Sequence, residues 1–203
     1  MPHYPLPDAH AAPPAEERDG FKFRSGRLAL DLPATLAFRL KPEPKDLLET
    51  PKDLGRWLVA SGLSKQNPHP TPEDLKAARG LRESLYRLAQ ACLKGEAFPA
   101  KDRALVNRWA AAPPPAPQLG AQPGSGGLTR AQEVSTLLAA VARDGVELLG
   151  GPLAARVRKC ARDGCALLFL DTSRSGRRRW CSMAACGNKA KVGAFRERLR
   201  AME

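Results

Sequence analysis

The sequence predicts an α+β protein that is mainly α-helical. It combines a helical N-terminal domain, which carries a small β-hairpin, with a short cysteine-rich C-terminal module. Two observations predict this fold class. Helix start signals followed by apolar residues at three- and four-residue steps recur between residues 50 and 149. Four of the five cysteines then gather between residues 160 and 186, in a segment too short to bury a large core. We expect an arm at residues 1–19, the helical domain at 20–151 and the cysteine-rich module at 152–203.

The first residues favour an unfolded arm and then a hairpin. Residues 1–19 are rich in Pro, Ala and His and lack a hydrophobic leader segment. We therefore expect His3 and His10 to be solvated and to bind no metal. Residues 21–32 alternate apolar and polar side chains around Ser25-Gly26, which is typical of two strands joined by a two-residue turn.

Helix signals then follow in order. Thr50-Pro51 and Thr71-Pro72 each precede an acidic residue, as at a capped helix start. Cys92 lies on the apolar face of the second of these helices, where a core position is expected rather than a redox role. Trp57 and Trp109 are expected to be core anchors.

The second half of the helical domain contains a break. A helix is expected from Pro99 to about Ala111, followed by a Pro- and Gly-rich loop at 112–127. Thr129-Arg-Ala-Gln132 is typical of a capping box and predicts the start of the last helix of this domain.

The cysteines are arranged as two pairs of identical spacing. Four residues separate Cys160 from Cys165, and four separate Cys181 from Cys186. Two such turns supply four soft ligands for one tetrahedral Zn²⁺, which would be structural because no coordination position stays open. Two disulfides, an iron–sulfur cluster and free thiols are the alternatives. Residues 166–180 read as a hairpin between the pairs, and a helix is expected from Lys189, so that the module is treble-clef-like. Trp180 is expected to pack beneath the zinc.

At these residues the chain resembles a known family. The string CARDGCALLFLDTSRSGRRRWCSMAACGNKAK closely resembles the CGNR zinc finger, a bacterial module named after the residues at its fourth cysteine. Here that tetrad is Cys186-Gly187-Asn188-Lys189, with Lys in place of Arg. In this family the finger follows a helical domain called ABATE, and the resemblance implies a transcription regulator. The family's Asn is absent from the segment Leu30–Thr35, which weakens any inference of small-molecule sensing. The same resemblance suggests that the loop at 112–127 is a shortened remnant of a family hairpin.

Positive charge is concentrated at the C-terminal end. Residues 156–200 contain 13 Lys and Arg against 3 acidic residues, a net charge of +10 out of +12 for the whole chain. Such a one-ended charge is typical of a module that binds a polyanion. The candidate nucleic-acid contacts lie on the hairpin and on the last helix: Arg174, Arg177, Arg178, Arg179, Lys189, Lys191, Arg196 and Arg200.

The sequence argues against other function classes. It contains no phosphate-binding loop, no paired acid and base and no nucleophile elbow, so we expect no enzyme. No apolar run approaches the length of a membrane span, and a cytoplasmic protein is expected. DNA is the expected partner, with the N-terminal domain sensing a signal or mediating association. An RNA-binding zinc protein and a protein-interaction adaptor are the alternatives. The oligomeric state, a homodimer included, is left open.

Overall fold

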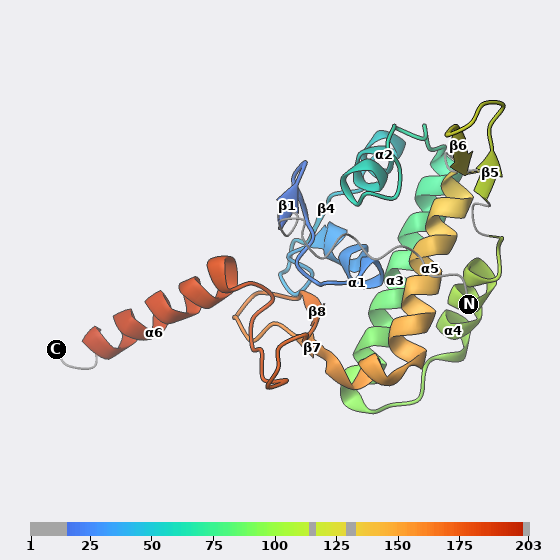
Figure 1. The fold of residues 1–203 in the computed structure, drawn as a ribbon. Helices are drawn as coiled ribbons and strands as arrows, with labels where there is room; N and C mark the ends of the chain where they lie inside the picture. The colour runs from blue at the N-terminus through green and yellow to red at the C-terminus, as the bar shows by residue number, and fades with distance from the viewer. Residues whose placement is uncertain (1–15, 114–116, 129–132, 201–203) are drawn as a thin grey trace.

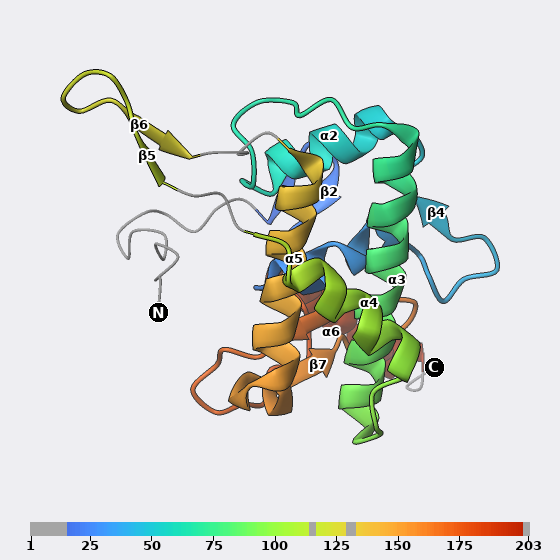
Figure 2. The ribbon, with the colours of Figure 1, turned by 90° about the vertical axis from the view of Figure 1, so that its right-hand side faces the viewer.

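The computed structural model describes residues 16–113, 117–128 and 133–200. Helices lead the architecture, and the mainly α, α+β class predicted from the sequence is confirmed. The α-helices are α1 (Leu28–Asp31), α2 (Pro51–Ala60), α3 (Pro72–Lys94), α4 (Ala100–Ala110), α5 (Val134–Gly150) and α6 (Asn188–Arg200). Shorter helical turns are η1 (Pro33–Thr35), η2 (Pro152–Arg156) and η3 (Met183–Gly187). Helices α3, α4 and α5 pack together, and α1 lies against α3 and α5 (Figures 1 and 2).

Two of the expected helix starts have the predicted geometry. The Thr50 hydroxyl accepts a hydrogen bond from the Asp53 N–H at 3.3 Å, and the Asp53 carboxylate accepts one from the Thr50 N–H at 2.8 Å. Thr71 and Asp74 form the same capping box at the start of α3. These reciprocal bonds satisfy backbone donors that the first helical turn leaves free. The expected capping box at 129–132 lies outside the described residues.

The core lies between these helices. Trp57 is fully buried, and Trp109 packs against the core while partly exposed. Cys92 is half-buried against the core, and its Sγ lies 3.4 Å from the Ala154 carbonyl oxygen. The expected core positions of these three residues are therefore confirmed. Among the described residues, no helix is long and apolar enough to cross a membrane.

The hairpin expected at residues 21–32 is wrong, because Phe21–Lys22 pairs with Glu17–Arg18 and the second half of the segment is helical. Residues Leu28–Asp31 form α1, and Ala29, Leu30 and Asp31 in succession are all buried. The alternation therefore does not separate a buried face from an exposed one. The Ala29 N–H at the helix start donates to the Asp144 carboxylate on α5 at 2.7 Å. A contact distant in sequence therefore favours the helix at this position.

Within the described residues, strands occur as four antiparallel pairs. The pairs are β1 (Glu17–Arg18) with β2 (Phe21–Lys22), β3 (Leu36–Ala37) with β4 (Lys45–Asp46), β5 (Pro117–Leu119) with β6 (Gly126–Leu128), and β7 (Val157–Lys159) with β8 (Leu168–Leu170). Strand β1 shows that ordered structure begins before residue 20, within the expected arm. Residues 1–15, with His3 and His10, lie outside the described residues. The pair β5–β6 agrees with the hairpin remnant that the family resemblance suggested.

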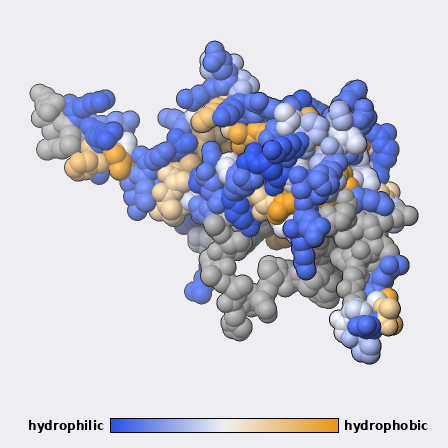
Figure 3. Space-filling model, turned by 90° about the horizontal axis from the view of Figure 1, so that it is seen from above, coloured by the Kyte–Doolittle hydropathy of each residue, from blue (hydrophilic) through white to orange (hydrophobic). Residues whose placement is uncertain are grey.

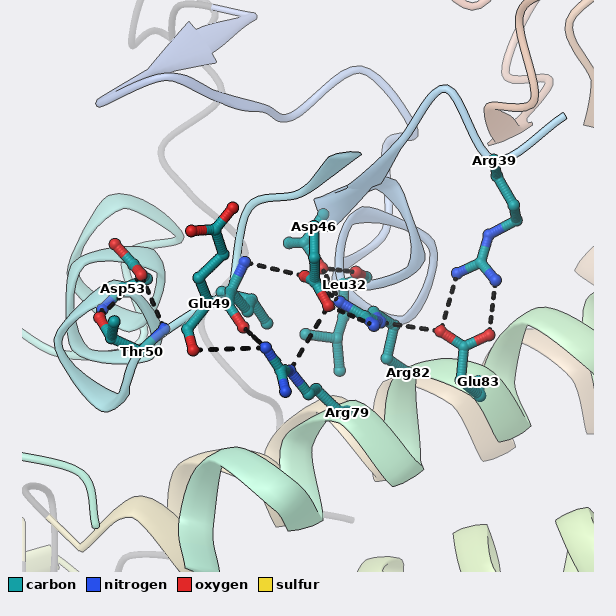
Figure 4. Close-up of polar contacts among 11 residues, drawn as sticks. Leu32, Arg39, Asp46, Glu49, Thr50, Asp53, Arg79, Arg82 and Glu83 are labelled. Carbon is teal, nitrogen blue, oxygen red and sulfur yellow. Dashed lines mark hydrogen bonds and ion pairs between the residues drawn. The ribbon is translucent and has the colours of Figure 1, made fainter. Parts of the chain in front are cut away.

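Ion pairs fasten the β3–β4 hairpin to α3 (Figure 4). The Arg82 guanidinium donates to the Asp46 carboxylate at 2.6 and 2.9 Å, with the Arg82 side chain only 5% exposed. Arg39, which follows β3, donates to Glu83 on α3 at 3.1 Å. The loop between β3 and β4, which stands out from the body in Figure 2, is therefore held at both ends.

The C-terminal module is joined to the helical domain through β8. Leu168 and Leu170 point into the core of the helical domain, whereas Phe169 between them packs against the cysteines. The two-residue period of a strand thus divides β8 between two cores. The Leu170 N–H donates to the Ser25 carbonyl at 2.7 Å and closes the joint. In contrast, α6 contacts η3 and projects away from the body (Figure 1).

Candidate metal centre and nucleic-acid interface

The four cysteines that the spacing predicted as zinc ligands lie together. Their Sγ atoms are all within 4.8 Å of one another. Cys186 Sγ lies 3.6 Å from Cys181 Sγ and 3.9 Å from Cys165 Sγ. A tetrahedral shell with Zn–S bonds of about 2.3 Å separates its sulfur atoms by roughly 3.8 Å, so the cluster fits one zinc ion. A disulfide would need about 2.05 Å, and all five cysteines are free.

Local backbone structure places each pair. Cys160 follows β7, and its N–H donates to the Leu167 carbonyl at 2.9 Å, which closes the hairpin around the first pair. Gly164, with φ of +72°, allows the turn that brings Cys165 back. In the second pair, the Ser182 hydroxyl accepts from the Ala185 N–H at 3.2 Å and caps the turn that carries Cys186.

The expected hairpin between the two pairs is wrong. Strand β8 pairs with β7, so the first pair of cysteines sits at the tip of the β7–β8 hairpin. Residues 177–180 return without forming a strand. The Arg178 N–H donates to Asp171 at 2.9 Å instead of to a strand partner. After the second pair, η3 runs directly into α6, which begins at Asn188, one residue before the expected helix start.

The close contact of the thiols shifts their pKa values in opposite directions. A hydrogen bond with Cys181 lowers the pKa of Cys165 to about 4, whereas that same bond and burial raise the pKa of Cys181. Neighbouring thiolates therefore oppose one another unless a metal ion lies between them. The Arg162 Nε donates to Cys186 Sγ at 3.1 Å and supplies part of the balancing charge.

Three contacts of this module escaped sequence reasoning. They are the Arg162 bond to Cys186, the Ser25 bond to β8, and a 2.6 Å hydrogen bond from the Ser182 hydroxyl to Glu16. The last two join residues more than 140 positions apart, and no local pattern announces them. Arg162 lies between Cys160 and Cys165 in the sequence, and this position next to the ligands could have predicted its bond to a cysteine.

Most of the predicted nucleic-acid contacts reach solvent. Seven of the eight side chains are exposed and form no ion pair within the described part of the chain: Arg174, Arg177, Arg179, Lys189, Lys191, Arg196 and Arg200. Arg178 differs, because its guanidinium bonds to the carbonyls of Trp180 and Cys181 and lies over the Phe169 ring. It is engaged in holding the finger together. Trp180 packs against the cysteine cluster, as expected.

The last helix is exposed on its apolar side as well. Its apolar stripe includes Val192 and Phe195, which are 49% and 55% exposed. Met202 and the Leu199 side chain, the rest of that stripe, lie outside the described residues. Figure 3 shows hydrophobic and hydrophilic residues side by side on the projecting helix. Within its described residues, α6 therefore presents both its basic and its apolar side chains to solvent.

Comparison with known families agrees with this division. Residues 26–152 match the ABATE family model, described as "Putative stress-induced transcription regulator", and residues 156–199 match the CGNR zinc finger. The second match assigns the metal as zinc rather than an iron–sulfur cluster. No curated protein matches the chain. The resemblance that the cysteine segment carries is therefore confirmed over both parts of the chain.

Proposed function

Because the chain belongs to the ABATE family and ends in a CGNR zinc finger, we propose that it is a cytoplasmic transcription regulator that binds DNA through the finger. In this proposal zinc holds the finger in shape and takes no part in a reaction. A four-cysteine shell leaves no coordination position for water or substrate, so we propose no enzymatic activity. The helical domain would sense a signal or mediate association.

One observation carries the proposal: the exposed cations of the finger lack acidic partners. Eight exposed Lys and Arg side chains lie in residues 174–200, and none forms an ion pair within the described residues. Unpaired surface cations are free to replace the counterions of a phosphate backbone. A projecting helix such as α6 has dimensions that suit the major groove of B-DNA, where Arg recognises guanine.

The experiment is selection of a random duplex library by the zinc-loaded chain, followed by affinity measurements at several salt concentrations. We expect one sequence to be enriched, and its binding to weaken steeply with salt. The RNA-binding alternative would be favoured if no sequence is enriched, binding still weakens steeply with salt, and RNA competes as well as DNA. No binding at moderate salt would contradict the proposal and favour the adaptor.

A matched pair of variants assigns the interface. Arg177→Gln with Arg179→Gln removes two exposed charges from the finger. Arg103→Gln with Arg108→Gln removes two exposed charges from α4 and serves as the control. We expect the first pair to reduce the slope of log K against log salt by about 1.8, because each phosphate contact contributes about 0.9. Equal effects of the two pairs would contradict a specific role for the finger.

A further inference from the structure

The loop after β3 contains an unusual aromatic residue. Phe38 has a φ of +55°, in the left-handed region that bulky apolar residues rarely adopt. Burial does not compensate for this strained backbone, because Phe38 is 47% exposed. The two other non-glycine residues with positive φ in the described chain are Asp19 and His69, types that tolerate this conformation better. A strained, exposed aromatic residue points to a role beyond folding.

Two lysines flank the Phe38 ring. The Nζ atoms of Lys22, on β2, and Lys41, in the same loop as Phe38, each lie 5.7 Å from the ring centroid. Neither ammonium group forms an ion pair within the part of the chain that the structure describes. Two like charges therefore lie near one aromatic ring, an arrangement that an anion would relieve.

This surface adjoins the zinc finger. Lys41 Cε lies 3.8 Å from where a side chain at Gly164 would begin. One pocket is lined by Lys22 and Phe38 from the helical domain and by Arg162 and Gly164 from the finger. Ala161, which precedes Arg162 in the sequence, donates its N–H to the Arg179 carbonyl at 2.8 Å. A series of contacts thus leads from Phe38 to the segment that carries the exposed Arg177 and Arg179.

The loop is also held in place before any partner arrives. Its flanks are fastened to α3 by the Arg39–Glu83 and Arg82–Asp46 ion pairs (Figure 4). An ordered loop loses little conformational freedom on binding, which favours affinity.

We propose that Lys22, Phe38 and Lys41 form a second DNA contact, continuous with that of the finger. Lys22 and Lys41 bind phosphates, and the Phe38 ring packs against the sugar or base beside them. This inference rests on the proposed DNA binding by the finger and extends the interface onto the helical domain. The finger and the hairpin then hold the same duplex, with the zinc knuckle between them.

The test compares the affinity of three double variants of the zinc-loaded, full-length chain for the enriched duplex. Lys22→Gln with Lys41→Gln should weaken binding roughly tenfold or more at 0.1 M salt and reduce the salt slope by about 1.8. Lys45→Gln with Lys52→Gln, two exposed lysines that do not line the pocket, is the charge-matched control and should change affinity less than about twofold. Arg177→Gln with Arg179→Gln reports on the finger alone.

A substitution at Phe38 separates function from folding. Glycine adopts positive φ without strain, so Phe38→Gly should leave the melting temperature unchanged or higher while weakening DNA binding. A role confined to folding would instead lower the melting temperature and leave affinity intact. If the lysine pair binds like the wild type while the finger pair is impaired, this inference is wrong and DNA binding by the finger stands. If the wild type binds no DNA, both proposals fail.

Discussion

The helical domain and the finger use arginine in opposite ways. Every ion pair in the described part of the chain joins residues between Glu16 and Glu147. Arg82, for example, is nearly buried and bonded to two carboxylates. In the finger, Arg177 and Arg179 are exposed and unpaired within the described residues. The ion-paired arginines of the helical domain therefore serve its own structure, whereas the exposed arginines of the finger remain available to a partner.

The difference follows from how each part is stabilised. The helical domain has a hydrophobic core and enough acidic residues to pair with its arginines. The finger has three acidic residues, of which Asp171 accepts bonds from Ser173 and Arg178 within the loop. A metal ion takes the place of the missing core, so the surface charge need not be balanced internally. A metal-held module can therefore keep its cations free.

Zinc removal should give the largest effect. Structural zinc contributes on the order of 10–16 kcal/mol in small fingers, so chelation or Cys181→Ser should unfold residues 160–187. The melting temperature of the helical domain should fall too, because β8 supplies part of its core. NMR spectra at known zinc content report the unfolding of the module, and thermal unfolding measures the melting temperature. Cys92→Ser, outside the cluster, is the control. A finger that stays folded without zinc would refute this account.

Substitutions at adjacent positions of β8 should affect the two cores differently. Leu168→Ala should lower the free energy of unfolding of the helical domain by about 2–5 kcal/mol, with zinc affinity little changed. Phe169→Ala should mainly weaken zinc binding, because its ring packs on the cysteines. Thermal unfolding and chelator competition distinguish them. Identical changes in both measurements would show that the two cores are one.

The helical domain should respond to pH through Asp31. Burial raises the pKa of this carboxyl to about 7. The folded-state pKa lies above the unfolded value, so the stability contribution is present below about pH 4 and is lost as pH rises towards 7. The melting temperature of Asp31→Asn should therefore exceed that of the wild type by a margin that grows between pH 5 and pH 8. A difference independent of pH would contradict the raised pKa.

Asp102 should act in the opposite direction. The hydrogen bond from Arg87 lowers its pKa, so its contribution is present above the unfolded pKa of about 4 and is lost as pH falls below that value. Asp102→Asn should accordingly be less stable than the wild type at pH 7, and this difference in stability should shrink towards pH 3. Melting curves at pH 7 and pH 3 provide the measurement.

The smallest effect is expected at Arg162. Its bond to Cys186 supports the thiolate without entering the metal shell, so Arg162→Gln should weaken zinc binding about tenfold. Competition with a chelator measures this affinity. Arg174→Gln removes an equal charge from the same module without touching a cysteine, and an equal loss in both variants would exclude a specific role for the Arg162 bond.

Local signals predicted the features that depend on neighbouring residues. Cysteine spacing identified the zinc ligands because a knuckle is a local turn, and Thr-Pro-x-Asp starts identified α2 and α3 because a cap is a local hydrogen bond. The alternation at residues 21–32 was misleading, because residues 29–32 in succession are all buried. Periodicity distinguishes a strand from a helix only when one face meets solvent.

By itself, the sequence determined the zinc site, two of the capped helices and the concentration of positive charge at the C-terminal end. Tertiary structure decided which strand β8 joins, which arginines meet carboxylates, and that Phe38 stands beside the finger between two lysines. The physical reason is range. Caps and knuckles close within a few residues, whereas pairs such as Glu16 with Ser182 form only after helices and strands have packed.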